Sequence, residues 1–328
     1  MISARRRAAG VFGMSVVGMI GMLTACAPNA SPNPTPTPTL AAFLIDRDFA
    51  DPEVIEASGQ YVAFAINARG GNVQFATSND LAHWTGSLED ALPKLPRWAS
   101  GGRTWAPDVS ARAGGDYIMY FVANQFPSDK QCIGVATSPV VTGPYTPVGE
   151  QPLVCPLDEG GAIDPATFTD DDGIRYLLWK NDGNCCGQDT WIQIAPLSPD
   201  GTQLAGPPTK LFTQTEPWEG QLVEAPVLVK RDGQYVLFYS ANDYATSDYA
   251  IGVATAPALM GPYVKSGTPL LSTESSGGRY IGPGGQDIVT TADGDVMLFH
   301  GWDELLIYRG LLSVPLHWDG AVPSVQLP

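Results

Sequence analysis

Five acidic residues stand at nearly even intervals along the chain, each nine to twelve residues ahead of an apolar segment. They are Asp51, Asp108, Asp164, Glu224 and Asp287. A single acid before a strand is most simply a turn residue that accepts hydrogen bonds from backbone amides. Five in register indicate more, because crowded carboxylates differ in pKa, so that one can act as an acid and another as a base. Paired carboxylates flanking a bond are the usual equipment for glycoside hydrolysis.

A repeated segment must position these acids. A Gly-rich turn followed by an apolar, aromatic stretch occurs five times, about 59 residues apart, at Tyr61, Tyr117, Tyr176, Tyr235 and Val296. Short segments rich in Tyr, Val, Ile and Phe and bounded by Gly, Asp and Pro are typical of strands, and no stretch past residue 40 has helical periodicity. This period predicts an all-β fold, a five-bladed β-propeller with four antiparallel strands per blade. Two β-sandwich domains would not explain five copies.

The propeller also predicts where the acids meet. The first strand of each blade is the innermost one, so equivalent residues of the five blades converge on the axis. We therefore expect all five acids to face one shallow pocket.

The N-terminal residues have the features of a targeting signal. Arg5, Arg6 and Arg7 precede an apolar stretch that ends in Leu-Thr-Ala-Cys at Cys26, a pattern typical of bacterial lipoproteins. We predict that residues 1–25 are a lipoprotein signal peptide and that Cys26 is lipidated; an ordinary secretory signal is the alternative. Residues 26–39 are predicted to be a Pro/Thr-rich linker, and residues 40–328 the catalytic propeller. The protein is then expected on the extracellular face of the cell envelope, or secreted.

The charge limits the class of partner. The chain has a formal net charge of −16, and an acidic surface repels phosphate backbones and anionic lipids. We therefore expect no nucleic-acid partner, contact with the membrane only through the lipid anchor, and a neutral oligo- or polysaccharide as substrate. A monomer is expected.

Four cysteines follow Cys26, and an even number outside the cytoplasm indicates disulfides. We expect a bond between Cys132 and Cys155. Cys185 and Cys186 would then form a vicinal disulfide or remain free thiols. A metal site is the poorer alternative, because no His lies near any of them in the sequence.

At the same acids the chain resembles glycoside hydrolase family 43. The motifs that carry the resemblance are Ala50-Asp51-Pro52, Trp105-Ala106-Pro107-Asp108-Val109, Ile163-Asp164-Pro165, Glu224-Ala225-Pro226 and a closing segment from Arg309 to Gly320. The resemblance implies that Asp51 is the general base, that Glu224 is the general acid, and that Asp164 tunes the acid and orients the sugar. It also implies inversion of configuration, which requires roughly 6.5–9.5 Å between acid and base.

Four further residues are candidates for substrate binding. Trp105 is expected to stack on a sugar face or to pack within its blade, and Arg309 to bond sugar hydroxyls or to form a salt bridge. Asp108 and Gln286 are expected to reach the same pocket.

The resemblance leaves a metal open. Many relatives have His where this chain has Gly285, and that His helps to hold calcium or its waters on the axis. No metal ligand and no required cofactor are therefore predicted. A structural calcium near His300 is the alternative to a core histidine there.

Together these features predict an inverting glycoside hydrolase for arabinose- or xylose-containing plant polysaccharide, of the α-L-arabinofuranosidase type. A β-xylosidase or an arabinanase of the same family is the alternative. A retaining fructan hydrolase would need an Asn-Asp-Pro-Asn type motif and a Glu-Cys acid, which the chain lacks. A non-catalytic sugar-binding lipoprotein would not need all three of Asp51, Asp164 and Glu224.

Overall fold

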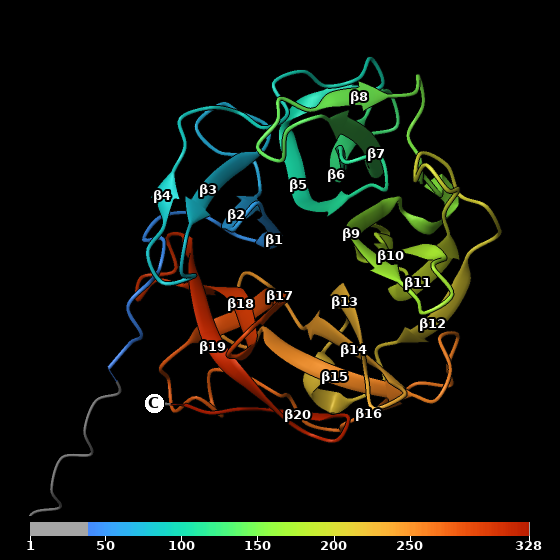
Figure 1. The fold of residues 1–328 in the computed structure, drawn as a ribbon. Coiled ribbons are helices and arrows are strands. Elements are labelled where there is room, and N and C mark those ends of the chain that lie inside the picture. The colour runs from blue at the N-terminus through green and yellow to red at the C-terminus, as the bar shows by residue number, and fades with distance from the viewer. Residues whose placement is uncertain (1–38, 328) are drawn as a thin grey trace, which may run out of the picture. The chain divides into compact units, whose positions relative to one another are not determined.

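Five antiparallel sheets of four strands each follow one another along the chain and surround a common axis (Figure 1). The structure is a computed structural model and describes residues 39–327. The predicted signal peptide, Cys26 and all of the linker except Thr39 lie outside this range. Within it, no helix is long and apolar enough to cross a membrane. The prediction of a five-bladed β-propeller is confirmed.

In each blade the innermost strand comes first in the chain, and the next three strands follow in order from the axis to the rim. Blade 1 comprises β1 (Glu53–Ala57), β2 (Gln60–Ala65), β3 (Gln74–Ser78) and β4 (Thr85–Gly86). Blade 2 comprises β5 (Ala99–Ala111), β6 (Tyr117–Gln125), β7 (Lys130–Ser138) and β8 (Thr146–Val148). Blade 3 comprises β9 (Ala162–Thr169), β10 (Arg175–Asn181), β11 (Trp191–Pro196) and β12 (Thr209–Thr213). Blade 4 comprises β13 (Val223–Arg231), β14 (Gln234–Ala241), β15 (Ala250–Ala256) and β16 (Val264–Lys265). Blade 5 comprises β17 (Ile281–Thr291), β18 (Gly294–Trp302), β19 (Arg309–Asp319) and β20 (Val322–Val325).

Three 3₁₀ turns lie in the loops of blades 3 and 4 and the approach to blade 3. They are η1 (Leu157–Glu159), η2 (Gly183–Cys186) and η3 (Pro217–Glu219). The second turn carries the adjacent cysteines, and Cys185 and Cys186 are bonded to each other there. A second disulfide joins Cys132 of β7 to Cys155, just beyond β8, so it ties a strand of blade 2 to the segment that leads into blade 3.

The ring closes where the start of the chain meets blade 5. Ile45 forms an antiparallel bridge with Leu311 of β19, and the amide of Phe49 donates to the carbonyl of Arg309 at 2.8 Å. Figure 1 shows blade 1 beside blade 5. This pairing covers a sheet edge that would otherwise be open, which is how a propeller protects its edges.

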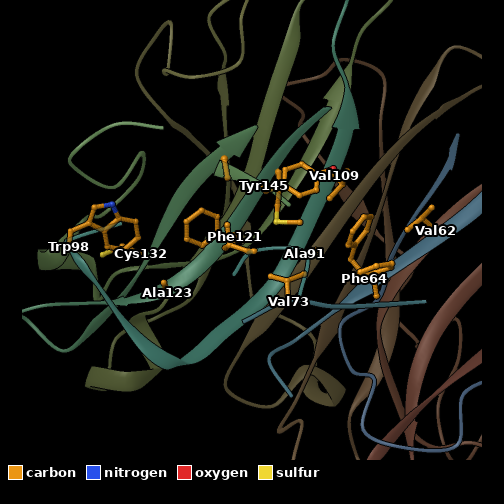
Figure 2. Close-up of a cluster of buried hydrophobic side chains, with 14 residues drawn as sticks. Val62, Phe64, Val73, Ala91, Trp98, Val109, Phe121, Ala123, Cys132 and Tyr145 are labelled. Atoms are coloured by element: carbon orange, nitrogen blue, oxygen red, sulfur yellow. The ribbon is translucent and has the colours of Figure 1, made fainter. Parts of the chain in front are cut away.

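The core consists of five apolar clusters, and each cluster lies between two neighbouring blades. Figure 2 shows the cluster between blades 1 and 2, with Phe64 of β2 and Phe121 of β6 among its side chains. Trp98 stacks on Phe121, with their ring centroids 6.2 Å apart. A Cβ at Gly134 would lie 2.5 Å from the Phe121 ring, so only glycine leaves room for this stack. Blade packing therefore fixes the positions of the inner strands.

In each blade a left-handed residue occupies an equivalent position, on or just before the innermost strand. These residues are Asp51, Ala106, Asp164, Ala225 and Gly285, with φ between 38° and 56°. The strand pairing shifts register beside this residue in the four blades where it lies within the strand. Such a bulge re-aims the neighbouring side chains, and here it determines which acids reach the mouth of the axis.

Candidate active site

A pocket of about 330 Å³ lies at the start of the inner strands. Its walls include Asp51, Asp164 and Glu224 from blades 1, 3 and 4, together with Trp105 and Arg309. Five segments that are far apart in the sequence thus supply one cavity. The structure brings the three predicted catalytic acids together, and with them two of the four predicted substrate-binding residues.

Asp51 stands between two basic side chains. One of its carboxylate oxygens, Oδ1, lies 3.2 Å from His300 Nδ1 and 3.9 Å from Arg309 Nη1. Burial by itself would raise the pKa of Asp51, but Arg309 and His300 outweigh it and hold the pKa below its ordinary value. Asp51 is therefore ionised at neutral pH, as a general base must be.

His300 was expected to be a core histidine of blade 5, and it is fully buried. Its partner, however, belongs to blade 1: the backbone amide of Asp51 donates to His300 Nδ1 at 3.1 Å. Burial, and then the nearby Arg309, lower the pKa of His300. Through Nδ1, His300 contacts both the backbone amide and the carboxylate of the base, a role that the sequence did not suggest.

A pair of glycines makes room for this arrangement. A Cβ at Gly285 would lie 2.6 Å from both Asp51 Oδ1 and His300 Nδ1, and a Cβ at Gly284 would lie 1.9 Å from the Tyr249 ring. The rings of Tyr249 and His300 stack with their centroids 5.8 Å apart. The Gly284-Gly285 segment therefore lets a stacked pair extend from the base toward the acid.

Glu224 is held by two donors. Tyr249 donates its hydroxyl to Oε1 at 2.8 Å, and Lys180 donates its ammonium to Oε2 at 3.1 Å. Glu224 is 8% exposed, so both carboxylate oxygens are engaged within a nearly closed environment. Neither donor was predicted: Lys180 lies on β10 of blade 3, and Tyr249 lies just before β15.

Asp164 lies beside Glu224. Its Oδ2 accepts the amide of Ala225 at 2.9 Å, which joins blade 3 to blade 4 one residue from the acid. Burial, and then the charge of Glu224, raise the pKa of Asp164 well above its ordinary value, although Lys180 opposes the shift. Two carboxyls that repel each other in this way retain a proton more readily than isolated ones, which is what acid catalysis needs.

Arg309 and Trp105 both line the pocket. The Arg309 guanidinium lies 5.1 Å from the centre of the Tyr244 ring and 5.7 Å from that of Trp302. Two aromatic rings and the Asp51 carboxylate thus hold it in one orientation. A fixed guanidinium beside a base is well suited to donate hydrogen bonds to a sugar hydroxyl.

The expectation that all five acids face one pocket is wrong for Asp108 and Asp287, and the same correction applies to Gln286. None of the three is among the residues that line the pocket. Asp108 and Asp287 stand two residues after the left-handed position of their strands, level with Glu53, whereas Asp51 and Asp164 occupy that position. Two residues correspond to about 6.6 Å along a strand, so the acids form two layers.

The lower layer holds neighbouring blades together. Asp108 Oδ2 accepts the amide of Thr167 at 2.9 Å, and Asp287 Oδ2 accepts the amide of Val54 at 2.8 Å. Gln286 donates to the carbonyl of Ala225 at 2.7 Å. Asp108 and Asp287 therefore have the ordinary role of an acid at a strand start, which is to accept hydrogen bonds from backbone amides.

The lower layer leads to a prediction about stability. Burial raises the pKa of Asp108 to about 7, against about 3.9 in an unfolded chain. Between about pH 4 and pH 7 the folded protein thus keeps a proton on Asp108 that the unfolded chain has released. The free energy of unfolding therefore falls as the pH rises through this range. At pH 8 the free energy of unfolding of Asp108→Asn should exceed that of wild type by about 2 kcal/mol, so the variant should unfold at a higher temperature; at pH 4 the gain should be much smaller. Thermal melts measure this, with the exposed Glu56→Gln as control. An equal effect at both pH values would contradict it.

An axial calcium would find few side-chain ligands among the described residues, since calcium is held mainly by oxygen atoms. Among residues 39–327, no three His, Cys, Asp or Glu side chains form a group that could hold a metal ion. His300, the alternative ligand, directs Nδ1 to the Asp51 amide, and its Nε2 is buried without a hydrogen-bond partner among the described residues. No step below is assigned to a metal.

Comparison with known proteins agrees with the site. The model of glycosyl hydrolases family 43 matches residues 43–315. Extracellular endo-alpha-(1->5)-L-arabinanase 1 of Bacillus subtilis (strain 168) is 26% identical over 294 residues, 84% of this chain and 86% of the relative. The crystal structure of an endo-1,4-beta-xylanase from Bacteroides thetaiotaomicron VPI-5482 has a TM-score of 0.74 at 26% identity and covers 87% of this chain and 96% of that one. The structure of a thermostable family-43 glycoside hydrolase has a TM-score of 0.75 at 25% identity, covering 89% and 95%. The chain is a glycoside hydrolase and belongs to family 43.

Proposed function

We propose that this enzyme hydrolyses α-L-arabinofuranosyl linkages in arabinan and inverts the anomeric configuration. The observation that carries the proposal is the pocket that brings an ionised Asp51 together with the half-buried Asp164 and the buried Glu224. The choice of arabinan rests on the relatives, since endo-arabinanases of two bacterial species and several fungi resemble the chain at 26–30% identity.

The proposed step is a single displacement. Asp51 takes a proton from water, and the water oxygen forms a bond to the anomeric carbon. The bond from that carbon to the linking oxygen breaks, and Glu224 gives its proton to the departing oxygen. Asp164 keeps the acid in place through the Ala225 amide, and Arg309 and Trp105 hold the sugar. Inversion is the expected outcome of such a step.

The size of the pocket favours a second candidate, the arabinofuranosidase type predicted from the sequence. A cavity of about 330 Å³, lined among others by residues of η2 and by Tyr244, suits the release of one terminal arabinose. Internal cleavage would need the chain to pass through and leave on both sides.

The location of the enzyme follows from its N-terminus and its relatives. We propose that it is exported and anchored through Cys26, and the arabinanases that it resembles in Bacillus subtilis and Thermotoga petrophila are named extracellular. Arabinan outside the cell would then be within its reach.

A panel of substrates tests the proposal. We expect turnover of linear α-1,5-arabinan and of 4-nitrophenyl α-L-arabinofuranoside, and at least 100-fold less of 4-nitrophenyl β-D-xyloside. Anion-exchange chromatography should separate arabinose, the product of terminal cleavage, from oligosaccharides. Proton NMR during the first turnovers should show the β-anomer of the new end. An α-anomer first would overturn inversion, and turnover of the xyloside alone would overturn the substrate.

A further inference from the structure

Lys180 is a fully buried lysine whose charge the mechanism above leaves unused. It lies near the end of β10, after the apolar residues Leu177, Leu178 and Trp179, and its side chain is 1% exposed. An ammonium taken out of water is costly unless anions surround it. Its Nζ lies 3.1 Å from Glu224 Oε2 and 3.4 Å from Asp182 Oδ1. Lys180 therefore sits between the acid and a second carboxylate that also lines the pocket.

The charges around Lys180 keep it protonated. Burial lowers its pKa, but Glu224, Asp182 and Asp164 outweigh burial and raise the pKa above its ordinary value. The titratable groups that face this cluster from the surrounding elements are Glu224 on β13, Asp164 on β9, Asp182 after β10, Tyr249 before β15, His300 on β18, Asp51 before β1 and Lys130 on β7. Lys180 is thus a permanent cation at working pH, in direct contact with the acid.

A cation in this place opposes the proposed role of Glu224. It favours the ionised carboxylate, while a general acid must hold a proton until the linkage breaks. Asp182 counters part of this effect, because it accepts a hydrogen bond from the same ammonium. The structure therefore contains a balance of one cation against three carboxylates.

We propose that Lys180 is a positioning residue that fixes Glu224 and, balanced by Asp182, sets the pH up to which Glu224 keeps its proton. The proposal rests on the proposed role of Glu224 as general acid. It applies to the described pocket and needs no contact between Lys180 and the sugar.

Two substitutions of opposite sign test it. Lys180→Met keeps the length of the side chain and removes the charge, so Glu224 should stay protonated to higher pH. Asp182→Asn removes an anion, so Glu224 should lose its proton at lower pH. An opposite charge within about 4–6 Å changes a titration by about 1–3 pH units. We therefore expect the alkaline limb of kcat/KM to move up by at least 1 pH unit in Lys180→Met and down in Asp182→Asn, while the acidic limb stays.

The control is another buried lysine. Lys265 pairs with the buried Glu219 in blade 4, with Nζ 2.7 Å from Oε1, and neither residue lines the pocket. Lys265→Met should lower the melting temperature without moving either limb. A shift of the alkaline limb in this variant too would mean that loss of any buried ion pair moves it, and would overturn the proposal.

A second measurement does not depend on activity. Carbon-13 NMR of protein labelled at the Glu carboxyl carbons, with the Glu224 signal assigned by its loss in Glu224→Gln, gives the titration midpoint of Glu224 directly. A higher midpoint in Lys180→Met and a lower one in Asp182→Asn support the proposal. Equal midpoints overturn it, and Asp182→Asn decides alone if Lys180→Met does not fold. An inactive wild type with shifted midpoints would overturn the proposed function and leave the balance of charges established.

Discussion

Glu224→Gln should lower kcat on linear arabinan by about 10³-fold, while activity on an aryl arabinofuranoside with a good leaving group should fall by about 10-fold or less. Protonation of a leaving group by a positioned acid contributes about 10²–10⁴-fold. An activated phenolate leaves with little protonation, so its departure does not need the acid. The ratio of the two losses therefore identifies the proton donor more clearly than either loss alone.

The surroundings of Glu224 make glutamine a suitable replacement. Its carbonyl oxygen can still accept from Tyr249, which donates to Oε1 at 2.8 Å, while the contact of Oε2 with Lys180 is lost. Steady-state kinetics on both substrates measure the effect, and a thermal melt checks the fold. Equal losses on both substrates would mean that Glu224 acts in another way than as a proton donor.

The architecture was readable from the sequence because it repeats. Few folds are compatible with five copies of one apolar segment at one period. In the structure each copy forms the second strand of a blade. Tyr61 lies in β2, Tyr117 in β6 and Tyr176 in β10. A repeat predicts the fold without any knowledge of which residues touch, since every copy needs the same neighbours.

The same alignment did not predict correctly which acids reach the pocket. It placed Asp108 in register with Asp51, yet Asp108 stands two residues further along its strand, below the pocket. The difference arises from the left-handed residue, which is Asp51 in blade 1 and Ala106 in blade 2. A bulge of this kind shifts which side chain points to the mouth, and counting residues upstream of a tyrosine does not detect it.

The residues that hydrogen-bond to the acids could not be predicted from the sequence for another reason. Lys180 and His300 act across blades, and Tyr249 acts within blade 4; their partners are 44, 249 and 25 residues away. One local signal was present: a lysine after the apolar run Leu177-Leu178-Trp179, where a buried second strand of a blade would ordinarily carry no charge. A buried charge in such a place indicates a partner, but the sequence does not show which one.

Asp51→Asn should abolish more activity than any other single change in this pocket, with kcat reduced by about 10³–10⁴-fold on both arabinan and the activated aryl arabinofuranoside. Both substrates need an activated water, so a better leaving group does not compensate for the loss of the base. The wild-type base is ionised down to an unusually low pH, because Arg309 and His300 hold its pKa below the ordinary value. The residual activity of the variant should therefore lack the acidic limb that the wild type shows.

Azide distinguishes loss of the base from loss of the fold. Asparagine keeps an oxygen near Arg309 and leaves the amide that His300 accepts, so the pocket should persist with room for a small anion in place of activated water. Azide should restore turnover of the aryl substrate in Asp51→Asn and give a glycosyl azide of inverted configuration, detected by NMR. The same azide should not restore Glu224→Gln, which still has its base. Rescue of Glu224→Gln with a retained azide product would instead assign a covalent intermediate to this enzyme, and near-wild-type rates in both variants would leave sugar binding without catalysis as the function of the pocket.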